Sequence, residues 1–164
     1  MCSVKAFGLV FLVFLVGCAT NNSMPTTLSA PRTEICRPTI ESEIAAPFDR
    51  WNQSLQTGDP RNVVANYAER SILLPTVSNK PRLTPAEKAD YFHHFLENRP
   101  SGKIDLRFIE IGCNTAVGAG LYTLTFAKTG EKVSGRYSFT YRWDGSKWLI
   151  TSHHSSLMPE IDKP

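Results

Sequence analysis

The side chains best suited to acid–base chemistry in this 164-residue chain lie together near its carboxyl end, at residues 152–156, Ser-His-His-Ser-Ser. Alternate side chains of an extended strand share a face, so His153 pairs with Ser155 and His154 pairs with Ser156. Whichever face points inward therefore carries one imidazole and one hydroxyl, groups that donate and accept hydrogen bonds. We take all four side chains as candidate catalytic residues.

The residues before this run predict the strand that must position it. Apolar Trp148, Leu149 and Ile150 follow an Asp144-Gly145 turn signal,. A strand that becomes polar in mid-course either faces water or lines a pocket. A solvated strand end is the alternative to a site, because polar residues are usually exposed.

Two helices are predicted upstream of the first strand. The first is capped by Thr39, and Pro47 should kink it or delay its start; its apolar stripe has helical spacing and comprises Ile40, Ile44, Phe48, Trp51 and Leu55,. The second begins at Asp59-Pro60, and Val63, Val64, Tyr67 and Ala68 form its buried side. A strand over 71–77 follows, with Pro75 at an edge or a bend.

A third helix begins at a capping box, Thr84-Pro85-Ala86-Glu87, and is predicted to run to about Asn98,. Its core face comprises Ala89, Phe92 and Leu96, with Phe95 as a further candidate. His93 and His94 lie on the other side of the helix, where we expect solvent.

Strands dominate from Lys103 onward, with further segments at 121–126 and 132–143 before the last strand. In the segment 132–143, aromatic residues alternate with polar ones at a two-residue period,. Helices followed by a long antiparallel meander indicate an α+β fold, in which a strongly curved antiparallel sheet wraps the helices as a cone. The open mouth of such a cone is a place for a pocket.

The amino-terminal segment predicts export. Residues 1–18 have the apolar core of a signal peptide and end in Leu15-Val16-Gly17-Cys18, which resembles a bacterial lipobox with Cys18 as the lipidation site,. An ordinary secretory signal is the alternative. Ala19 in place of aspartate favours the periplasmic face of the outer membrane. Residues 19–35 are polar and read as a flexible tether, and 36–164 form a single α+β catalytic domain.

Two cysteines, Cys36 and Cys113, remain in the predicted domain, and an exported protein with such a pair suggests a disulfide; two free thiols are the alternative,. The formal net charge of the whole chain is +3, and no basic run stands out. This composition argues against a nucleic-acid partner, and we expect membrane contact only through the N-terminal lipid.

The order of these motifs resembles the iota-class carbonic anhydrases, whose domain is similar to the calcium/calmodulin-dependent kinase association domain and to other cone-shaped folds of the nuclear-transport-factor type. The resemblance covers about residues 40–160. It is carried by Trp51, Thr57-Gly58-Asp59-Pro60, Leu73-Leu74-Pro75-Thr76, Tyr91-Phe92, Arg136-Tyr137-Ser138-Phe139 and His153-His154-Ser155-Ser156-Leu157-Met158-Pro159. The chain departs from the family at Ser152, where a third histidine is usual.

The resemblance implies reversible hydration of CO2 to bicarbonate and a proton. Bicarbonate would meet Thr76, Tyr91 and the His–Ser pair in one pocket, because a small anion needs a few convergent donors. A histidine near its reference pKa of about 6.5 would accept the proton that water loses.

The spacing of the histidines disfavours a metal. Zinc usually takes three protein ligands, and His153 and His154 point apart on a strand. We therefore expect no cofactor, with zinc or manganese as the alternative, since the family is described as containing members of both kinds.

Two other functions are open. One is a non-catalytic association or small-ligand-binding module, for which the aromatic row Tyr137, Phe139, Tyr141 and Trp143 is a candidate interface, although a place in the core is the alternative. The other is an isomerase or dehydratase, which requires a roomier cavity for an apolar substrate. We expect a homodimer.

Overall fold

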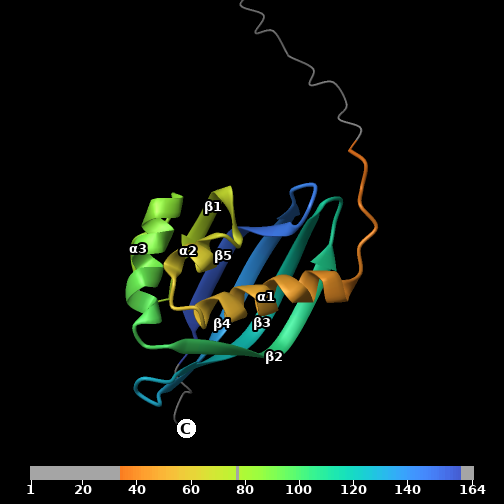
Figure 1. Cartoon of the computed structure of the whole chain (residues 1–164). Helices are drawn as coiled ribbons and strands as arrows, with labels where there is room; N and C mark the ends of the chain where they lie inside the picture. The colour runs from red at the N-terminus through yellow and green to blue at the C-terminus, as the bar shows by residue number, and fades with distance from the viewer. Residues whose placement is uncertain (1–33, 77, 160–164) are drawn as a thin grey trace, which may run out of the picture. The chain divides into compact units, whose positions relative to one another are not determined.

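The computed structural model describes residues 34–76 and 78–159. Figure 1 shows helices on one side of a strongly curved sheet. In chain order the elements are α1 (Glu41–Leu55), α2 (Pro60–Val64), β1 (Tyr67–Leu74), α3 (Pro85–Leu96), β2 (Pro100–Ile111), β3 (Thr115–Phe126), β4 (Lys132–Trp143) and β5 (Trp148–Leu157). The predicted α+β class is confirmed.

The five strands form one sheet in the order β1-β5-β4-β3-β2. The meander from β2 to β5 is antiparallel as predicted, but β1 pairs with β5 in parallel, so the sheet is mixed. The physical reason is the connection: β1 is separated from β5 by α3 and the whole meander, and so long a crossover permits a parallel pair. In this register Leu73 lies beside His153 and Leu74 beside His154.

The start of α1 differs from the sequence prediction. Ile40 is the N-cap and has no side-chain cap bond, whereas Thr39 exchanges hydrogen bonds with Arg37 outside the helix. Pro47 lies within a continuous helix that begins well before it. Its ring is buried, so apolar packing compensates for the missing amide donor,.

The second helix is shorter than expected, and the first strand begins earlier. Asp59 caps α2 by accepting a hydrogen bond from the amide of Arg61, as predicted. Buried Asn66 follows the helix and ends it. Its side-chain amide donates to the backbone carbonyls of Asn62 and Val63, while its backbone carbonyl accepts a hydrogen bond from the backbone amide of Ile150. Tyr67 and Ala68, assigned to the helix from sequence, therefore open β1.

The capping box at Thr84 and Glu87 is present, and α3 ends two residues before the predicted Asn98. Strand β3 begins six residues before the predicted segment at 121–126. The prediction missed its first half because two alanines and two glycines there weaken the strand signal,. Gly120 shows why they are small: a Cβ there would lie 1.9 Å from the carbonyl oxygen of Leu106, at the bulge in β2,.

The aromatic row of β4 belongs to the core. Tyr137, Phe139 and Tyr141 are buried, and their neighbours Arg136 and Arg142 are exposed. This alternation confirms the predicted two-residue period. It also removes these three side chains as a candidate association surface.

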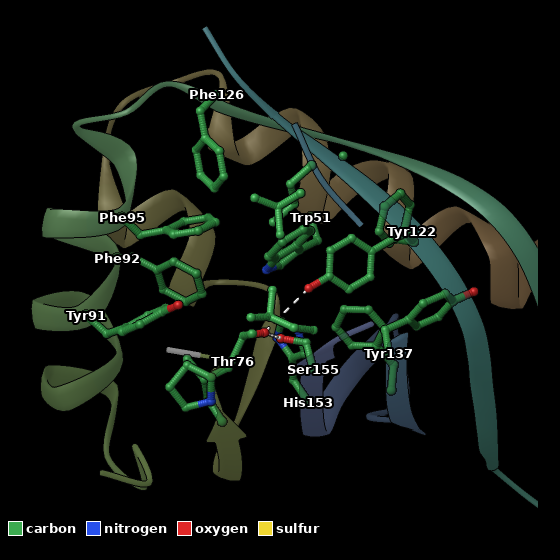
Figure 2. A pocket seen from close by; sticks show the side chains of 18 of the residues that line it. Trp51, Thr76, Tyr91, Phe92, Phe95, Tyr122, Phe126, Tyr137, His153 and Ser155 are labelled. Atoms are coloured by element: carbon green, nitrogen blue, oxygen red, sulfur yellow. Dashed lines mark hydrogen bonds between the residues drawn. The ribbon is translucent and has the colours of Figure 1, made fainter. Parts of the chain in front are cut away.

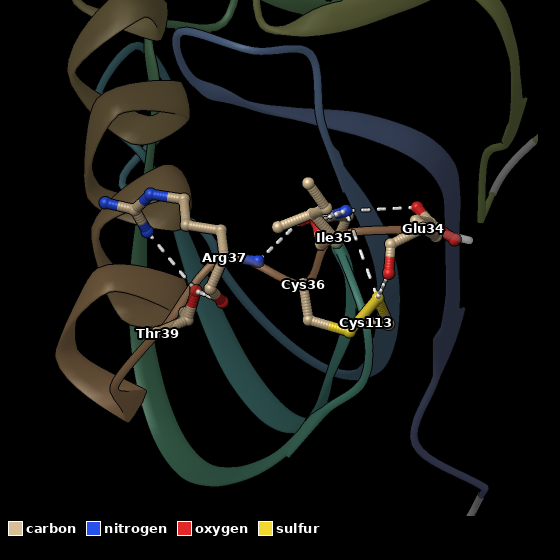
Figure 3. Close-up of a disulfide and its surroundings, with 7 residues drawn as sticks. Glu34, Ile35, Cys36, Arg37, Thr39 and Cys113 are labelled. Carbon is tan, nitrogen blue, oxygen red and sulfur yellow. Dashed lines mark hydrogen bonds between the residues drawn. A yellow bond between two sulfur atoms is a disulfide. The ribbon is translucent and has the colours of Figure 1, made fainter.

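A disulfide joins Cys36 to Cys113, across 77 positions of sequence (Figure 3). Around it, the side-chain amide of Asn114 accepts a hydrogen bond from the Arg37 amide and donates one to the carbonyl of Ile35. The Arg37 guanidinium also lies 4.2 Å from the ring centroid of Trp143. The residues before α1 are thus fixed to the β2–β3 turn.

The proposed signal peptide, Cys18 and most of the tether lie outside the described residues. In the described part of the chain, every helix is too short or too polar to cross a bilayer.

Candidate functional site

A cavity of about 290 Å³ opens between the helices and the concave face of the sheet (Figure 2). Helix α1 contributes Trp51, α3 contributes Tyr91, Phe92 and Phe95, and the sheet contributes mainly aromatic and aliphatic side chains. The apolar face of each helix therefore has two roles: part of it packs in the core, and part of it lines the cavity.

Three hydroxyl groups meet at one wall of this cavity. The Oγ1 atom of Thr76 lies 2.6 Å from the Oγ atom of Ser155 and 3.5 Å from the hydroxyl of Tyr122. Thr76 lies two residues beyond the end of the β1 edge strand, Ser155 is on β5 and Tyr122 is on β3, so three separate segments bring these groups together. Gly135 makes room for the tyrosine, since a Cβ there would lie 2.7 Å from its ring.

His153 lies in the same cavity and ends a buried chain of hydrogen bonds. The indole nitrogen of Trp51 donates to the hydroxyl of Tyr67 over 3.2 Å, and that hydroxyl lies 2.7 Å from Nδ1 of His153. The Tyr67 hydroxyl has no acceptor other than Nδ1 among the described residues, so satisfying its proton makes it the donor. The imidazole is then neutral, with its proton on Nε2.

The environment of His153 favours this neutral form. Burial, and secondarily the charge of His154, lower the pKa of His153 to about 3 from 6.5. The imidazole also packs 4.2 Å from the ring centroid of Phe139. The expected histidine base with a pKa near 6.5 is therefore corrected: at neutral pH His153 is a hydrogen-bond donor held in a fixed tautomer.

Tyr91 lines the cavity from α3, as the resemblance implied. Its ring stacks on Phe95, and the Arg82 guanidinium lies 5.7 Å from its ring centroid. Burial raises the pKa of Tyr91 to about 12, so its hydroxyl keeps its proton and can donate,.

His154 and Ser156 lie away from the cavity. Strand alternation places His154 in an exposed position, opposite Ser138 of β4, and Ser156 opposite Arg136. The structure therefore brings His153 and Ser155 together with Thr76, whereas His154 and Ser156, also taken from sequence as candidate catalytic residues, do not line the cavity.

The cavity wall has almost no charge. Glu131, at the β3–β4 turn, is the only charged lining residue among those described. It and His153 are also the only lining side chains of a type that ligates zinc, which is fewer than the usual three. The donor set of the cavity does not fit a zinc ion.

Sequence reasoning missed Tyr122, Tyr67 and Glu131. Tyr122 and Tyr67 sit in segments whose pattern indicates only a buried strand or helix, and nothing local distinguishes a core tyrosine from a site tyrosine. Glu131 belongs to a hairpin turn in which a charged residue is ordinary.

Comparisons with known proteins agree with this fold. Residues 40–159 match the family model of the calcium/calmodulin-dependent protein kinase II association domain. A crystal structure from Xanthomonas campestris, provisionally described as such a domain, has 40% identity and a TM-score of 0.70, covering 78% of this chain and 98% of that one. The search among curated proteins gives no match.

More distant structures share the fold alone. An NTF2-like protein with a cystatin-like fold from Novosphingobium aromaticivorans has 13% identity and a TM-score of 0.62, covering 74% of this chain and 84% of its own. A protein from Streptomyces avermitilis, provisionally described as a dehydratase of the NTF2-like family, has 10% identity and a TM-score of 0.65. The match covers 72% of this chain and 95% of that one.

Proposed function

The chain belongs to the calcium/calmodulin-dependent protein kinase II association-domain family, and from this premise we propose that it is a carbonic anhydrase, hydrating CO2 to bicarbonate and a proton without a metal. The observation that carries the proposal is the Thr76–Ser155 hydroxyl pair, 2.6 Å apart, beside the neutral imidazole of His153 in one cavity. This arrangement matches the residues that the resemblance to the iota class implies.

The cavity suits an uncharged substrate that becomes an anion. The aromatic wall receives CO2, which is apolar, and excludes bulk water from the reacting carbon,. As water attacks, negative charge grows on the substrate oxygens. The Nε2 proton of His153 and the hydroxyl of Tyr91 are donors for that charge, and such preorganised donors act strongly in a site of low polarity.

The proton leaves through hydroxyl groups. A hydroxyl accepts a proton on its oxygen while passing its own to a neighbour, and Thr76, Ser155 and Tyr122 are close enough to do so in sequence,. The water oxygen forms its bond to carbon, the O–H bond of the water breaks, and the proton reaches solvent or buffer at the open side of the cavity. Glu131, the charged residue of the wall, then repels the bicarbonate product.

The test is stopped-flow CO2 hydration by the full chain purified in detergent, before and after treatment with a strong chelator. We expect hydration above the buffer rate that survives chelation. Hydration that disappears with the chelator and returns with zinc or manganese would overturn the metal-free mechanism. A folded sample without activity under any of these conditions would overturn the carbonic anhydrase assignment.

One observation favours a second candidate, a module that binds a small aromatic or other apolar molecule. The cavity, at about 290 Å³, is about ten times the roughly 30 Å³ that a water molecule occupies, and its wall is mostly aromatic and aliphatic,. Titration with 2-naphthol, followed by the tryptophan fluorescence of the chain, to which Trp51 in the cavity contributes, tests this reading. Saturable quenching together with no CO2 hydration would favour the binding module, and an isomerase or dehydratase would then be sought.

We propose in addition that the protein is exported, lipidated at Cys18 and held at the periplasmic face of the outer membrane as a homodimer. The disulfide between Cys36 and Cys113 supports an oxidising compartment,. Exposed Leu106 and Phe108 on β2 are the apolar side chains that a second copy would cover,. Labelling with a radioactive fatty acid, and light scattering of wild type and Phe108→Glu, test these two points.

A further inference from the structure

The outer side of α3 carries a cluster of metal-ligating side chains that the proposed reaction does not use. His93, His94 and Glu97 each offer a ligand atom, and these three atoms all lie within 4.8 Å of one another. All three side chains are exposed, near the carboxyl end of the helix. We propose that they form a surface site for a divalent transition-metal ion, separate from the cavity.

The spacing of the ligand atoms fits a tetrahedral ion. Zinc bonds of about 2.1 Å to nitrogen and oxygen put neighbouring ligand atoms about 3.4 Å apart. The Nδ1 atom of His94 and the Oε1 atom of Glu97 are already 3.4 Å apart. His93 must come closer by little more than an ångström, and its exposed side chain can do so by small rotations about its own bonds.

Helix geometry explains how three residues reach one point. His93 and Glu97 are four positions apart and His94 and Glu97 are three apart, and both spacings place side chains together on a helix surface. The imidazole rings of His93 and His94 have centroids 5.2 Å apart. A simple ion pair between His94 and Glu97 uses two of the three residues, whereas a metal site uses all three.

The local field favours a cation. The carbonyl groups at the end of α3 carry the negative end of the helix dipole,. Glu97 makes no ion pair with lysine or arginine in the part of the chain that the structure describes, so its carboxylate is available.

The donor set selects the class of ion. Two imidazole nitrogens and one carboxylate oxygen suit zinc, copper, nickel and cobalt, whereas magnesium and calcium prefer oxygen ligands throughout. Three protein ligands leave a fourth position for water.

The site is distinct from the proposed catalysis. The cavity is lined by Tyr91, Phe92 and Phe95 from the inner side of the same helix, and the cluster is absent from that lining. A bound ion would hold the last turn of α3 together but would not touch the substrate.

The experiment is calorimetric titration of zinc, and absorption titration of cobalt, into the chelator-treated full chain in detergent. We expect one ion per chain, with visible cobalt bands of tetrahedral strength, and binding at least tenfold weaker in His94→Ala and in Glu97→Gln. The matched control is His154→Ala, which removes an exposed histidine from β5 and should bind as wild type does.

The outcomes are separable from those of the CO2 assay. No saturable binding, or binding unchanged in both cluster variants, overturns the metal site whatever the hydration rate. Binding that is lost in His153→Ala and kept in Glu97→Gln also overturns it, because the ion would then lie in the cavity. Circular dichroism of each variant confirms that it is folded, which the exposure of the cluster leads us to expect.

Discussion

The hydroxyl of Tyr67 lies 2.7 Å from Nδ1 of His153, in a fully buried contact between the first strand and the last. Trp51 donates to the same hydroxyl from α1. This relationship fixes which nitrogen of the imidazole carries the proton. Tyr67 is therefore a positioning residue, acting through His153.

Replacing Tyr67 with phenylalanine should release the imidazole from this tautomer. Loss of the donor leaves Nδ1 buried and unpaired, at a cost of about 1–3 kcal/mol in the free energy of unfolding. Two-bond ¹H–¹⁵N spectra of His153 measure the tautomer directly, and denaturant titration measures stability. The control is Tyr141→Phe, since Tyr141 is equally buried and makes no hydrogen bond to His153. A wild-type tautomer pattern in Tyr67→Phe would contradict the assigned chain of donors.

Ser155→Ala should lower the rate of CO2 hydration by about 100- to 10,000-fold, the usual contribution of one positioned proton-transfer group. Ser155 contacts Thr76 at the cavity wall, whereas its neighbour Ser156 lies on the other face of β5. The matched control is therefore Ser156→Ala, which should keep the wild-type rate. Equal losses in the two variants would show that the face assignment is irrelevant to catalysis.

The free energy of unfolding should begin to decrease as the pH is lowered through about 6.5, before the carboxylates titrate. The unfolded chain protonates His153 near its ordinary pKa of 6.5, whereas the folded chain keeps it neutral until about pH 3. The unfolded state therefore binds more protons as pH falls, and the stabilisation present above pH 6.5 is lost below it, approaching about 1.4 kcal/mol per pH unit.

The window from pH 6.5 to 4.5 isolates this effect. Depressed carboxyl groups such as Glu87, whose pKa backbone hydrogen bonds lower to about 2 from 4.5, destabilise only below that window. Denaturant titrations across it should show the slope in wild type and in His154→Asn, and lose it in His153→Asn. A slope that persists in His153→Asn would assign the effect to another group.

Breaking the disulfide should lower stability without slowing hydration. The bond between Cys36 and Cys113 closes a loop of 77 positions, for which loop entropy gives about 4 kcal/mol,. We expect the Cys36→Ser/Cys113→Ser variant to unfold at a lower denaturant concentration than wild type. A reductant should lower the unfolding midpoint of wild type and leave that of the variant unchanged. Its CO2 hydration should match wild type, because the bridge contributes no residue to the cavity.

Local rules predicted the elements that carry strong signals. The capping box at Thr84 and the alternation of β4 depend on residues close together in the sequence, and the structure contains both as predicted. The parallel pairing of β1 with β5 joins residues as far apart as Leu73 and His153, and no local pattern encodes it. The boundary at Asn66 depends in part on a buried side-chain amide that is also bonded to Ser54 and Arg50 of α1, which no local pattern encodes.

The candidate site was predictable in its residue types and not in its orientation. The pairing of His153 with Ser155 follows from strand alternation alone, but which pair faces inward depends on the one-residue register of β5 against β4,. The pKa of His153 depends on burial among aromatic rings from several elements, so sequence could supply only its unperturbed value.

The attachment of the residues before α1 has a mechanical consequence. A pull applied to the chain ahead of Glu34 reaches Cys36 first, and the disulfide passes the load to Cys113 and the β2–β3 turn. Load carried in this way bypasses α1, whereas an unbridged chain would pass it to α1 first. Oxidation of the two cysteines therefore keeps a helix that lines part of the cavity out of the path of a force applied ahead of Cys36.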